Sequence, residues 1–295
     1  MGVNRLVAMP AEEYHADPCE RPSLSSSIAR TLLTKSPLHA WHEHPRLNPD
    51  HVPEERTEFD LGSAAHALLL EGEDRMAVID ADSYRTKVAQ EARDAARAAK
   101  MHPILKARYD DVRRMADVAR TAIAHCPDLS GITLEDGKAE LVGIWEEEGA
   151  IMRFRPDWVA DNRSVMLDYK TTTDATPDSF TRQIARMGYH IQSAFYRRGM
   201  MAIEGADIPF VLVAQETQPP YAVSFHGCAP TMLEIAEAEV ERAIDTWREC
   251  MRRNSWPAFT QRIYWAEAAV WQQMQHDERQ IGNAYDVSKL WEKAA

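Results

Sequence analysis

Two short acidic motifs constrain the fold of this chain more than any other feature of its sequence. Pro156-Asp157 and Asp168-Tyr169-Lys170 each follow a run of apolar residues. Both runs read as β-strands, predicted over 151–159 and 164–170, with a turn between them. Because alternate residues of a strand face the same side, Asp168 and Lys170 point together while Tyr169 points away. Adjacent strands would then bring two carboxylates and one ammonium into a single pocket.

Such a pocket has the chemistry of a metal-dependent phosphodiesterase. Hard divalent cations such as Mg²⁺ bind oxygen ligands, and a cation would offset the energetic penalty of a carboxylate at Asp168, which ends a buried run. A lysine beside the cation can orient a water molecule and stabilise charge on a phosphate. The alternative for Asp157 is a polar residue that ends a strand near a turn. The alternative for Asp168 and Lys170 is that they lie on an ordinary solvated strand edge.

Two other segments carry polar residues on predicted helices. A helix predicted from about Thr57 to Glu71 carries His66 before a leucine-rich turn, where the alternative is a hydrogen-bonded core histidine. A helical region predicted over 177–204 places Gln192 and Tyr196 four residues apart on one face. The alternative there is that Tyr196 packs in the core and Gln192 lies on the surface.

These segments together resemble the PD-(D/E)xK nuclease superfamily and, within its RecB-like branch, the RecE-like exonucleases (exodeoxyribonuclease VIII). Pro156-Asp157 followed by Asp168-Tyr169-Lys170 is similar to the superfamily motif. Residues 62–72 resemble the helix that carries a metal-binding histidine, and residues 189–196 contain a Gln-x-x-x-Tyr motif. Residues 24–27 and 35–39 resemble the N-terminal segment of RecE-type enzymes. The order and spacing match over roughly residues 23–260.

The resemblance implies a restriction-endonuclease-like α/β fold, in which a short central mixed β-sheet is flanked by helices and preceded by a helical N-terminal region. The metal ligands that it implies are His66, Asp157, Asp168, the carbonyl of Tyr169 and a glutamate, for which Glu140 is the candidate. Lys170 would position and activate the attacking water, and Gln192 and Tyr196 would flank the scissile phosphate. The implied metal is Mg²⁺, with Mn²⁺ as a substitute. For Glu140, the alternative is a solvent-facing strand residue, with Glu135, Asp136 and Glu146 as competitors.

Basic residues are candidates for DNA contacts. In lambda-type exonucleases an arginine of a comparable N-terminal helix recognises the 5′-phosphate, which makes Arg30 and Lys35 candidates here. Ordinary surface charge is the alternative for both. The residues that would line a DNA path around the helix of Gln192 are Arg182, Arg186, Arg197 and Arg198.

Composition limits the function classes only in part. The formal charge of −12 is unlike that of most DNA-binding proteins, but a negative exterior around a basic channel is compatible with a nuclease. The four cysteines are scattered without a C-x-x-C pair, so we expect reduced thiols and no iron–sulfur cluster. No apolar run approaches the ~18 residues that cross a bilayer, and residues 1–18 lack a signal-peptide pattern. We therefore expect a cytoplasmic protein with no membrane partner.

We expect one nuclease domain over 1–295, because no linker separates parts of the chain. It would comprise a mainly helical part (1–130), a catalytic α/β core (138–253) and a C-terminal extension (254–295). A hairpin through Glu148-Gly149 would join strands at 139–146 and 151–159. Further strands are predicted over 208–215 and 221–226, and further helices over 83–100, 103–125 and 230–253.

The predicted function is a Mg²⁺-dependent exodeoxyribonuclease. The resemblance implies digestion of linear double-stranded DNA from the 5′ end, which leaves 3′ single-stranded tails for phage-type recombination. It also implies a ring-shaped oligomer, with a tetramer favoured, and a single-strand annealing protein as partner. Two alternatives stay open: a structure-selective or site-specific endonuclease on the same core, and a protein that binds DNA or a recombination partner without cutting.

Overall fold

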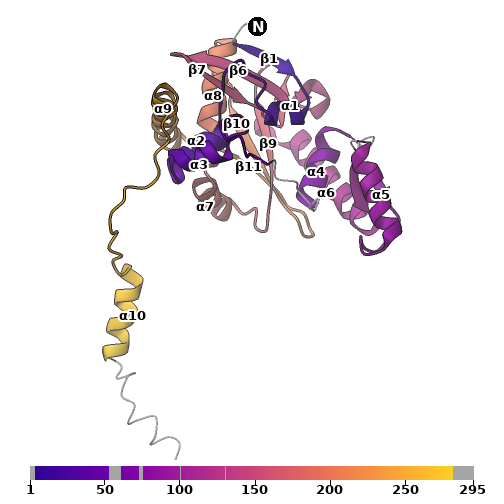
Figure 1. Ribbon diagram of the computed structural model, residues 1–295. Helices are drawn as coiled ribbons and strands as arrows, with labels where there is room; N and C mark the ends of the chain where they lie inside the picture. Colours follow the sequence, from indigo (N-terminus) through magenta and orange to yellow (C-terminus); the bar gives the residue numbers. More distant parts are fainter. Residues whose placement is uncertain (1–3, 53–60, 73–75, 100, 130, 282–295) are drawn as a thin grey trace, which may run out of the picture. The chain divides into compact units, whose positions relative to one another are not determined.

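A computed structural model of the chain describes residues 4–52, 61–72, 76–99, 101–129 and 131–281 (Figure 1). The chain divides into two compact units, Met1–Ala258 and Phe259–Ala295. The described part of the second unit contains helix α10 (Val270–Ile281), which buries no side chain. Its large apolar residues are exposed, including Trp265 (84%) and Trp271 (60%). All sheets and the candidate site belong to the first unit.

A five-stranded mixed sheet forms the centre of the first unit. Its strands follow the order β11-β10-β9-β8-β5. Their bounds are β5 (Gly137–Ala139), β8 (Trp158–Ala160), β9 (Met166–Thr172), β10 (Phe210–Glu216) and β11 (Val223–Gly227). Strands β9 and β10 are parallel and the other pairs are antiparallel. Parallel neighbours need a crossover connection, which helices α7 (Pro177–Met187) and α8 (Tyr189–Glu204) supply.

A second, four-stranded sheet follows the order β1-β6-β7-β2. Its strands are β1 (Arg5–Ala8), β2 (Leu24–Ser25), β6 (Leu141–Glu147) and β7 (Ala150–Phe154). The predicted hairpin joins β6 to β7 and is confirmed: Glu148 and Gly149 both have positive φ, at 46° and 84°. Two positive φ values match the type I′ turn that follows the twist of a hairpin.

The chain crosses between these two sheets at two corners, and both corners carry acidic residues. Glu140 separates β5 from β6, and Arg155-Pro156-Asp157 separates β7 from β8. The strand predicted over 139–146 therefore corresponds to β6 from residue 141 onward, whereas the single strand predicted over 151–159 is wrong, because it divides into β7 and β8. Proline has no N–H for a sheet ladder, and Glu140 adopts a left-handed φ of 57°. The Glu140 N–H donates to the Asp157 carbonyl at 2.9 Å, which joins the two corners.

Helices cover both faces of the five-stranded sheet (Figure 1). On one face, α2 (Ser26–Thr34), α8 and α9 (Pro230–Arg253) pack on both sheets, with Trp145, Phe154 and Phe195 fully buried between them. On the other face, α4 (Leu61–Leu70) and α6 (Lys106–His125) pack against Leu167 and Tyr169. Mixed sheets between helical layers confirm the predicted α/β fold class.

The remaining elements precede the central sheet. They are α1 (Ala11–His15), α3 (Pro37–Glu43), α5 (Lys87–Ala98) and the parallel pair β3 (Met76–Ile79) and β4 (His102–Leu105). Residues 57–60 of the predicted histidine-bearing helix lie outside the described residues. The helix predicted over 177–204 is two helices, because Gly188 takes a φ of +72° between them.

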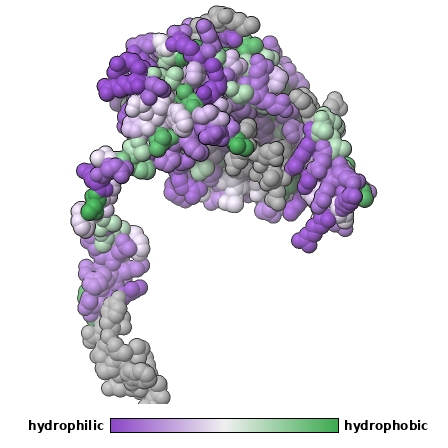
Figure 2. Space-filling model, in the orientation of Figure 1, coloured by the Kyte–Doolittle hydropathy of each residue, from purple (hydrophilic) through white to green (hydrophobic). Residues whose placement is uncertain are grey.

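The described surface is mostly hydrophilic on the face shown in Figure 2, where hydrophobic residues are scattered. No helix among the described residues is long and apolar enough to span a membrane.

Candidate metal centre

Three potential metal ligands meet at the sheet corners. His66 comes from α4, Glu140 from the corner before β6, and Asp157 from the corner before β8. One donor atom of each lies within 4.8 Å of the other two. His66 Nε2 is 3.2 Å from Asp157 Oδ1 and 3.6 Å from Glu140 Oε1. All three side chains are partly exposed, at 25%, 20% and 17%, so a cation and a substrate can reach them from solvent.

The position of His66 depends on a close contact between α4 and β9. A Cβ added to Gly62 would lie 2.4 Å from Thr171 Oγ1, so only glycine fits there without a shift. This contact brings the first turn of α4 against the strand that carries Asp168 and Lys170. His66 follows one turn later, beside the Tyr169 ring at a centroid distance of 6.4 Å.

Asp168 and Lys170 form the second half of the site. They share a face of β9, as strand alternation predicts, and Lys170 Nζ forms an ion pair with Asp168 Oδ2. Gln192 Nε2 of α8 donates to the other oxygen, Asp168 Oδ1, at 2.7 Å. The Lys170 ammonium also lies 5.2 Å from the centre of the Tyr189 ring. Asp168 is 1% exposed, whereas the Lys170 side chain is 22% exposed, so the ammonium is the more accessible partner.

A backbone hydrogen bond links the two halves. The Tyr169 N–H donates to Asp157 Oδ2 at 2.7 Å, which leaves Oδ1 directed toward His66. Burial favours the neutral form of Asp157, but the positive charges of His66 and Lys170, together with this hydrogen bond, hold its pKa below the usual value. Asp157 is therefore the carboxylate of this site that is most readily ionised.

Three neighbouring groups are perturbed in the opposite direction. Burial raises the pKa of Asp168 to about 6, and the charge of Asp157 adds to this while Lys170 opposes it. Burial likewise raises the pKa of Glu140 to about 7, against the opposing effect of Arg155. Burial disfavours protonated His66, but the charges of Asp157 and Glu140 outweigh it and raise the imidazole pKa. Burial is thus the main cause of the two raised carboxyl pKa values, and the neighbouring carboxylates are the cause of the raised His66 pKa.

The donor set fits a divalent cation. Glu140 Oε2 and Asp168 Oδ2 are buried and accept no aligned hydrogen bond from the described residues, although Arg155 and Lys170 respectively form ion pairs with them. Two carboxylates and an imidazole suit Mg²⁺ less well than an all-oxygen set, and they suit Mn²⁺ well. Asp168 lies outside the 4.8 Å group of His66, Glu140 and Asp157 and interacts with Lys170 and Gln192, and its predicted role as a metal ligand stays a prediction.

Tyr196 supports the corner from inside the core. It is 5% exposed, and its hydroxyl donates to the Arg155 carbonyl at 3.2 Å. Its ring packs on Phe154 and Phe210. The packing alternative for Tyr196 therefore describes its position in the structure, while Gln192 reaches the site. Metal ligation by the Tyr169 carbonyl stays a prediction.

The predicted DNA-binding residues divide into paired and unpaired groups. Lys35 pairs with Glu43 at 2.7 Å, and Arg30 Nη1 donates to the Met187 carbonyl at 2.9 Å at the end of α7. Arg197 pairs with Asp207, and Arg198 pairs with Glu147 and Glu241. Arg182 and Arg186 are exposed on α7. Arg182 is close enough to Asp174 for its charge to help lower the pKa of that carboxyl, and no ion pair of Arg186 is found among the described residues.

Sequence reasoning assigned no role to Arg155, which contacts Glu140 directly. Its Nε lies 2.7 Å from Glu140 Oε2, and its guanidinium lies over the Tyr14 ring at 5.2 Å. Its place immediately before Pro156-Asp157 was a usable signal. The Tyr14 contact was not, because Tyr14 is far away in sequence and lies on a five-residue helix.

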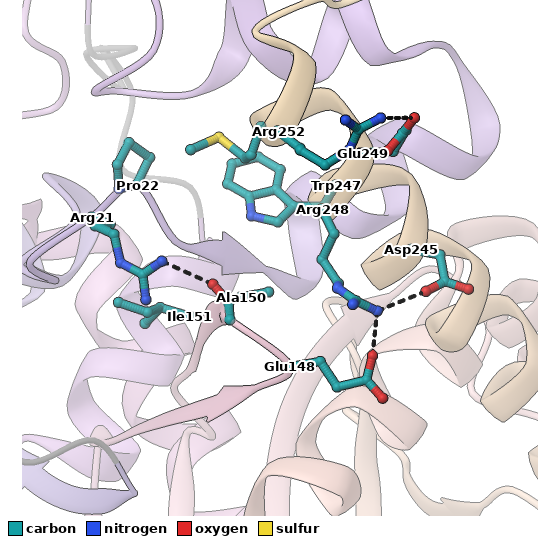
Figure 3. Close-up of a pocket in the computed structure, with 12 residues that line it drawn as sticks. Arg21, Pro22, Glu148, Ala150, Ile151, Asp245, Trp247, Arg248, Glu249 and Arg252 are labelled. Carbon is teal, nitrogen blue, oxygen red and sulfur yellow. Dashed lines mark hydrogen bonds and ion pairs between the residues drawn. The ribbon is translucent and has the colours of Figure 1, made fainter.

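A cleft of about 670 Å³ lies apart from this cluster, between the β6–β7 hairpin and α9 (Figure 3). Its arginines already have partners. Arg21 donates to the Gly149 carbonyl at 3.0 Å, and Arg248 pairs with Asp245 at 3.2 Å and with Glu148 at 2.5 Å. Arg252 pairs with Glu249 at 2.8 Å. The cleft therefore offers no free positive charge for a phosphate.

Comparisons with known proteins bear on the family and the fold. Residues 25–267 match the model of a family described as "PDDEXK-like domain of unknown function (DUF3799)". No match was found among curated proteins. A crystal structure of a provisionally named exonuclease from Eubacterium rectale is similar, with a TM-score of 0.54 and 14% identity over 90% of this chain and 97% of that one. A phage-related exonuclease from Haemophilus somnus 129PT has a TM-score of 0.29 and 12% identity over 65% of this chain and 95% of that one. The first likeness supports the fold, and the second is too low to support any argument.

Proposed function

The chain belongs to the PDDEXK-like domain family DUF3799, and on that premise we propose that it is a divalent-cation-dependent exodeoxyribonuclease. Membership confirms the superfamily predicted from Pro156-Asp157 and Asp168-Tyr169-Lys170. The RecE-like branch, the metal and the substrate are parts of the proposal.

One observation supports the proposal most strongly: His66, Glu140 and Asp157 converge within 4.8 Å beside the Asp168–Lys170 pair. These three would hold the cation, with Asp168 close enough to raise the pKa of His66. When bound, a divalent cation supplies Lewis-acid stabilisation to a phosphate and lowers the pKa of a bound water. A hydrogen-bonded core histidine would need one acceptor, but His66 faces two carboxylates.

Lys170 would act on the phosphate and the attacking water. Its ammonium is anchored by Asp168 and by the Tyr189 ring, so its Nζ is held in a fixed position with N–H donors to spare. Those donors can orient a water for in-line attack and stabilise the charge that builds on the phosphate oxygens. Gln192 would act through Asp168, because its amide fixes the carboxylate that anchors the lysine.

The substrate and assembly are proposed from the family resemblance. Linear double-stranded DNA would enter at an end and be digested 5′ to 3′, as in RecE-like enzymes. Arg182 and Arg186 support a DNA path along α7, because both are exposed positive charges on one helix. A ring-shaped oligomer, a single-strand annealing partner and a role in phage-type recombination complete this proposal.

The experiment uses end-labelled linear duplex DNA and closed circular duplex DNA in parallel, each with Mg²⁺ and, separately, with Mn²⁺. The expected result is loss of linear DNA with intact circles, and a preference between 5′-phosphorylated and 5′-hydroxyl ends. Asp157→Asn and Lys170→Ala should cut neither substrate, while Arg163→Gln, in an exposed pair with Glu204, should cut like the wild type. Cut circles would favour the endonuclease alternative. DNA binding without any cleavage by the wild-type chain would refute the enzyme proposal.

A further inference from the structure

Arg155 holds one oxygen of the Glu140 carboxylate. Its Nε lies 2.7 Å from Glu140 Oε2, while the other oxygen, Oε1, lies 3.6 Å from His66 Nε2. The contact is an ion pair and not an aligned hydrogen bond, but a carboxylate is planar, so attraction of one oxygen to Arg155 favours the orientation in which the other oxygen points toward His66. Both side chains are largely buried, at 15% and 20% exposure, which limits the alternatives open to either group. Arg155 therefore sets the direction of Glu140 toward His66 and Asp157.

Arg155 is itself held at three points. Pro156 follows it and restricts its backbone, and Tyr196 donates a hydrogen bond to its carbonyl at 3.2 Å. Its guanidinium lies over the Tyr14 ring, with 5.2 Å between Cζ and the ring centre. A guanidinium over the face of an aromatic ring is attracted to it, and more strongly where water is excluded. Tyr14 is 7% exposed, so the contact is buried.

The Tyr14 ring is fixed by a second arginine. Arg153 lies 5.4 Å from the same ring, and its Nη1 is 3.3 Å from Asp17 Oδ1 and 2.7 Å from the Ser23 carbonyl. Asp17 follows α1 closely and has no solvent exposure in its side chain. A continuous set of contacts thus runs from Asp17 through Arg153, Tyr14 and Arg155 to Glu140.

We propose that Arg155 is a positioning residue of the cation site, and that Tyr14 holds it in place. The N-terminal residues 11–17 then contribute to the geometry of the site, although none of them is a metal ligand. This inference rests on the proposed function, because it requires that His66, Glu140 and Asp157 bind a cation. It adds to that function the residues that orient one ligand from outside the ligand set.

The test is isothermal titration of the full chain with Mn²⁺ alone, in the absence of DNA. Loss of an outer partner of a metal ligand weakens metal affinity about 10- to 100-fold, which is the change expected for Arg155→Gln. Arg155→Lys keeps the positive charge but lacks the planar guanidinium, so its Mn²⁺ affinity should lie between that of the wild type and that of Arg155→Gln. Tyr14→Phe keeps the ring and should bind like the wild type, whereas Tyr14→Leu should bind more weakly.

Two controls separate this inference from the proposed function. Arg163→Gln removes an arginine that pairs with a glutamate elsewhere, and it should leave Mn²⁺ binding unchanged. His66→Ala should abolish binding. If the wild type and His66→Ala are alike, the cation site itself is refuted.

If His66→Ala loses Mn²⁺ while Arg155→Gln binds it as tightly as the wild type, or more tightly, only the positioning role is refuted. Arg155→Lys decides the question if Arg155→Gln does not fold. A purely structural role would lower thermal stability and leave the affinity of the folded protein unchanged, and that outcome also overturns the proposal.

Discussion

Replacing Asp17 with asparagine should strongly destabilise the first unit. The Asp17 side chain has no solvent exposure, and it accepts hydrogen bonds from the Ser23 N–H at 2.9 Å and the Ser23 hydroxyl at 2.7 Å. Its charge also faces Arg153, whose side chain is only 4% exposed. Asparagine preserves the shape but leaves the guanidinium buried without a counter-charge. Removal of one partner from a buried ion pair costs about 3–5 kcal/mol of unfolding free energy. Arg153 keeps its hydrogen bonds to the Ser23 carbonyl and hydroxyl, so we expect a loss near the lower end, about 3 kcal/mol.

The pKa of Asp17 sets the pH range over which this carboxylate stabilises the fold. Burial raises the pKa of Asp17, but His44, Arg153 and Ser23 outweigh it and lower the pKa from 3.8 to about 2. Because the folded value is the lower one, this contribution to stability is complete above about pH 4 and disappears as the pH falls toward 2. A shift of this size corresponds to about 2 kcal/mol.

Urea unfolding at pH 7 and at intervals down to pH 3 measures the stability loss of Asp17→Asn and its dependence on pH. Asp17→Asn should be about 3 kcal/mol less stable than the wild type at pH 7, and the difference should narrow below pH 4. Glu204→Gln breaks a pair of 28% and 33% exposed side chains and serves as the matched control, with a loss below about 1 kcal/mol. An Asp17→Asn variant within 1 kcal/mol of the wild type at pH 7 would refute the reasoning.

Three more substitutions test local packing and the site. Gly62→Ala should lower stability by about 1–3 kcal/mol in thermal unfolding, because its Cβ would lie 2.4 Å from Thr171 Oγ1; a recovery in the double variant with Thr171→Ala is expected, and an unchanged midpoint would contradict the contact. Gly149→Ala should cost about 1 kcal/mol in the same assay, because φ is +84° in the hairpin turn; no loss would mean that the turn relaxes. Gln192→Ala should reduce kcat on DNA about 10- to 100-fold, since it removes the hydrogen bond to Asp168; a changed KM with normal kcat would indicate substrate binding instead.

Local patterns in the sequence predict most of the central elements. Alternation identified β9 correctly and placed Asp168 and Lys170 on one face, and Glu148-Gly149 identified the hairpin. Two local signals in the sequence indicate boundaries that the predicted elements lack. Pro156 marks the end of β7, and Gly188 separates α7 from α8.

The remaining features depend on contacts between distant segments. Strands β1 and β2 are short and pair with β6 and β7, so they have little periodicity of their own. The left-handed backbone of Glu140 is stabilised by its hydrogen bond to the Asp157 carbonyl, which no local pattern could reveal. The role of Arg155 likewise follows from a fold that brings two sheet corners together.

Anomalous diffraction from crystals of the full chain grown with Mn²⁺ tests the central claim most directly. The account predicts an anomalous peak roughly 2 Å from His66 Nε2, Glu140 and Asp157, with Lys170 adjacent. A peak at another position, or bound Mn²⁺ that leaves these three side chains free, would contradict it.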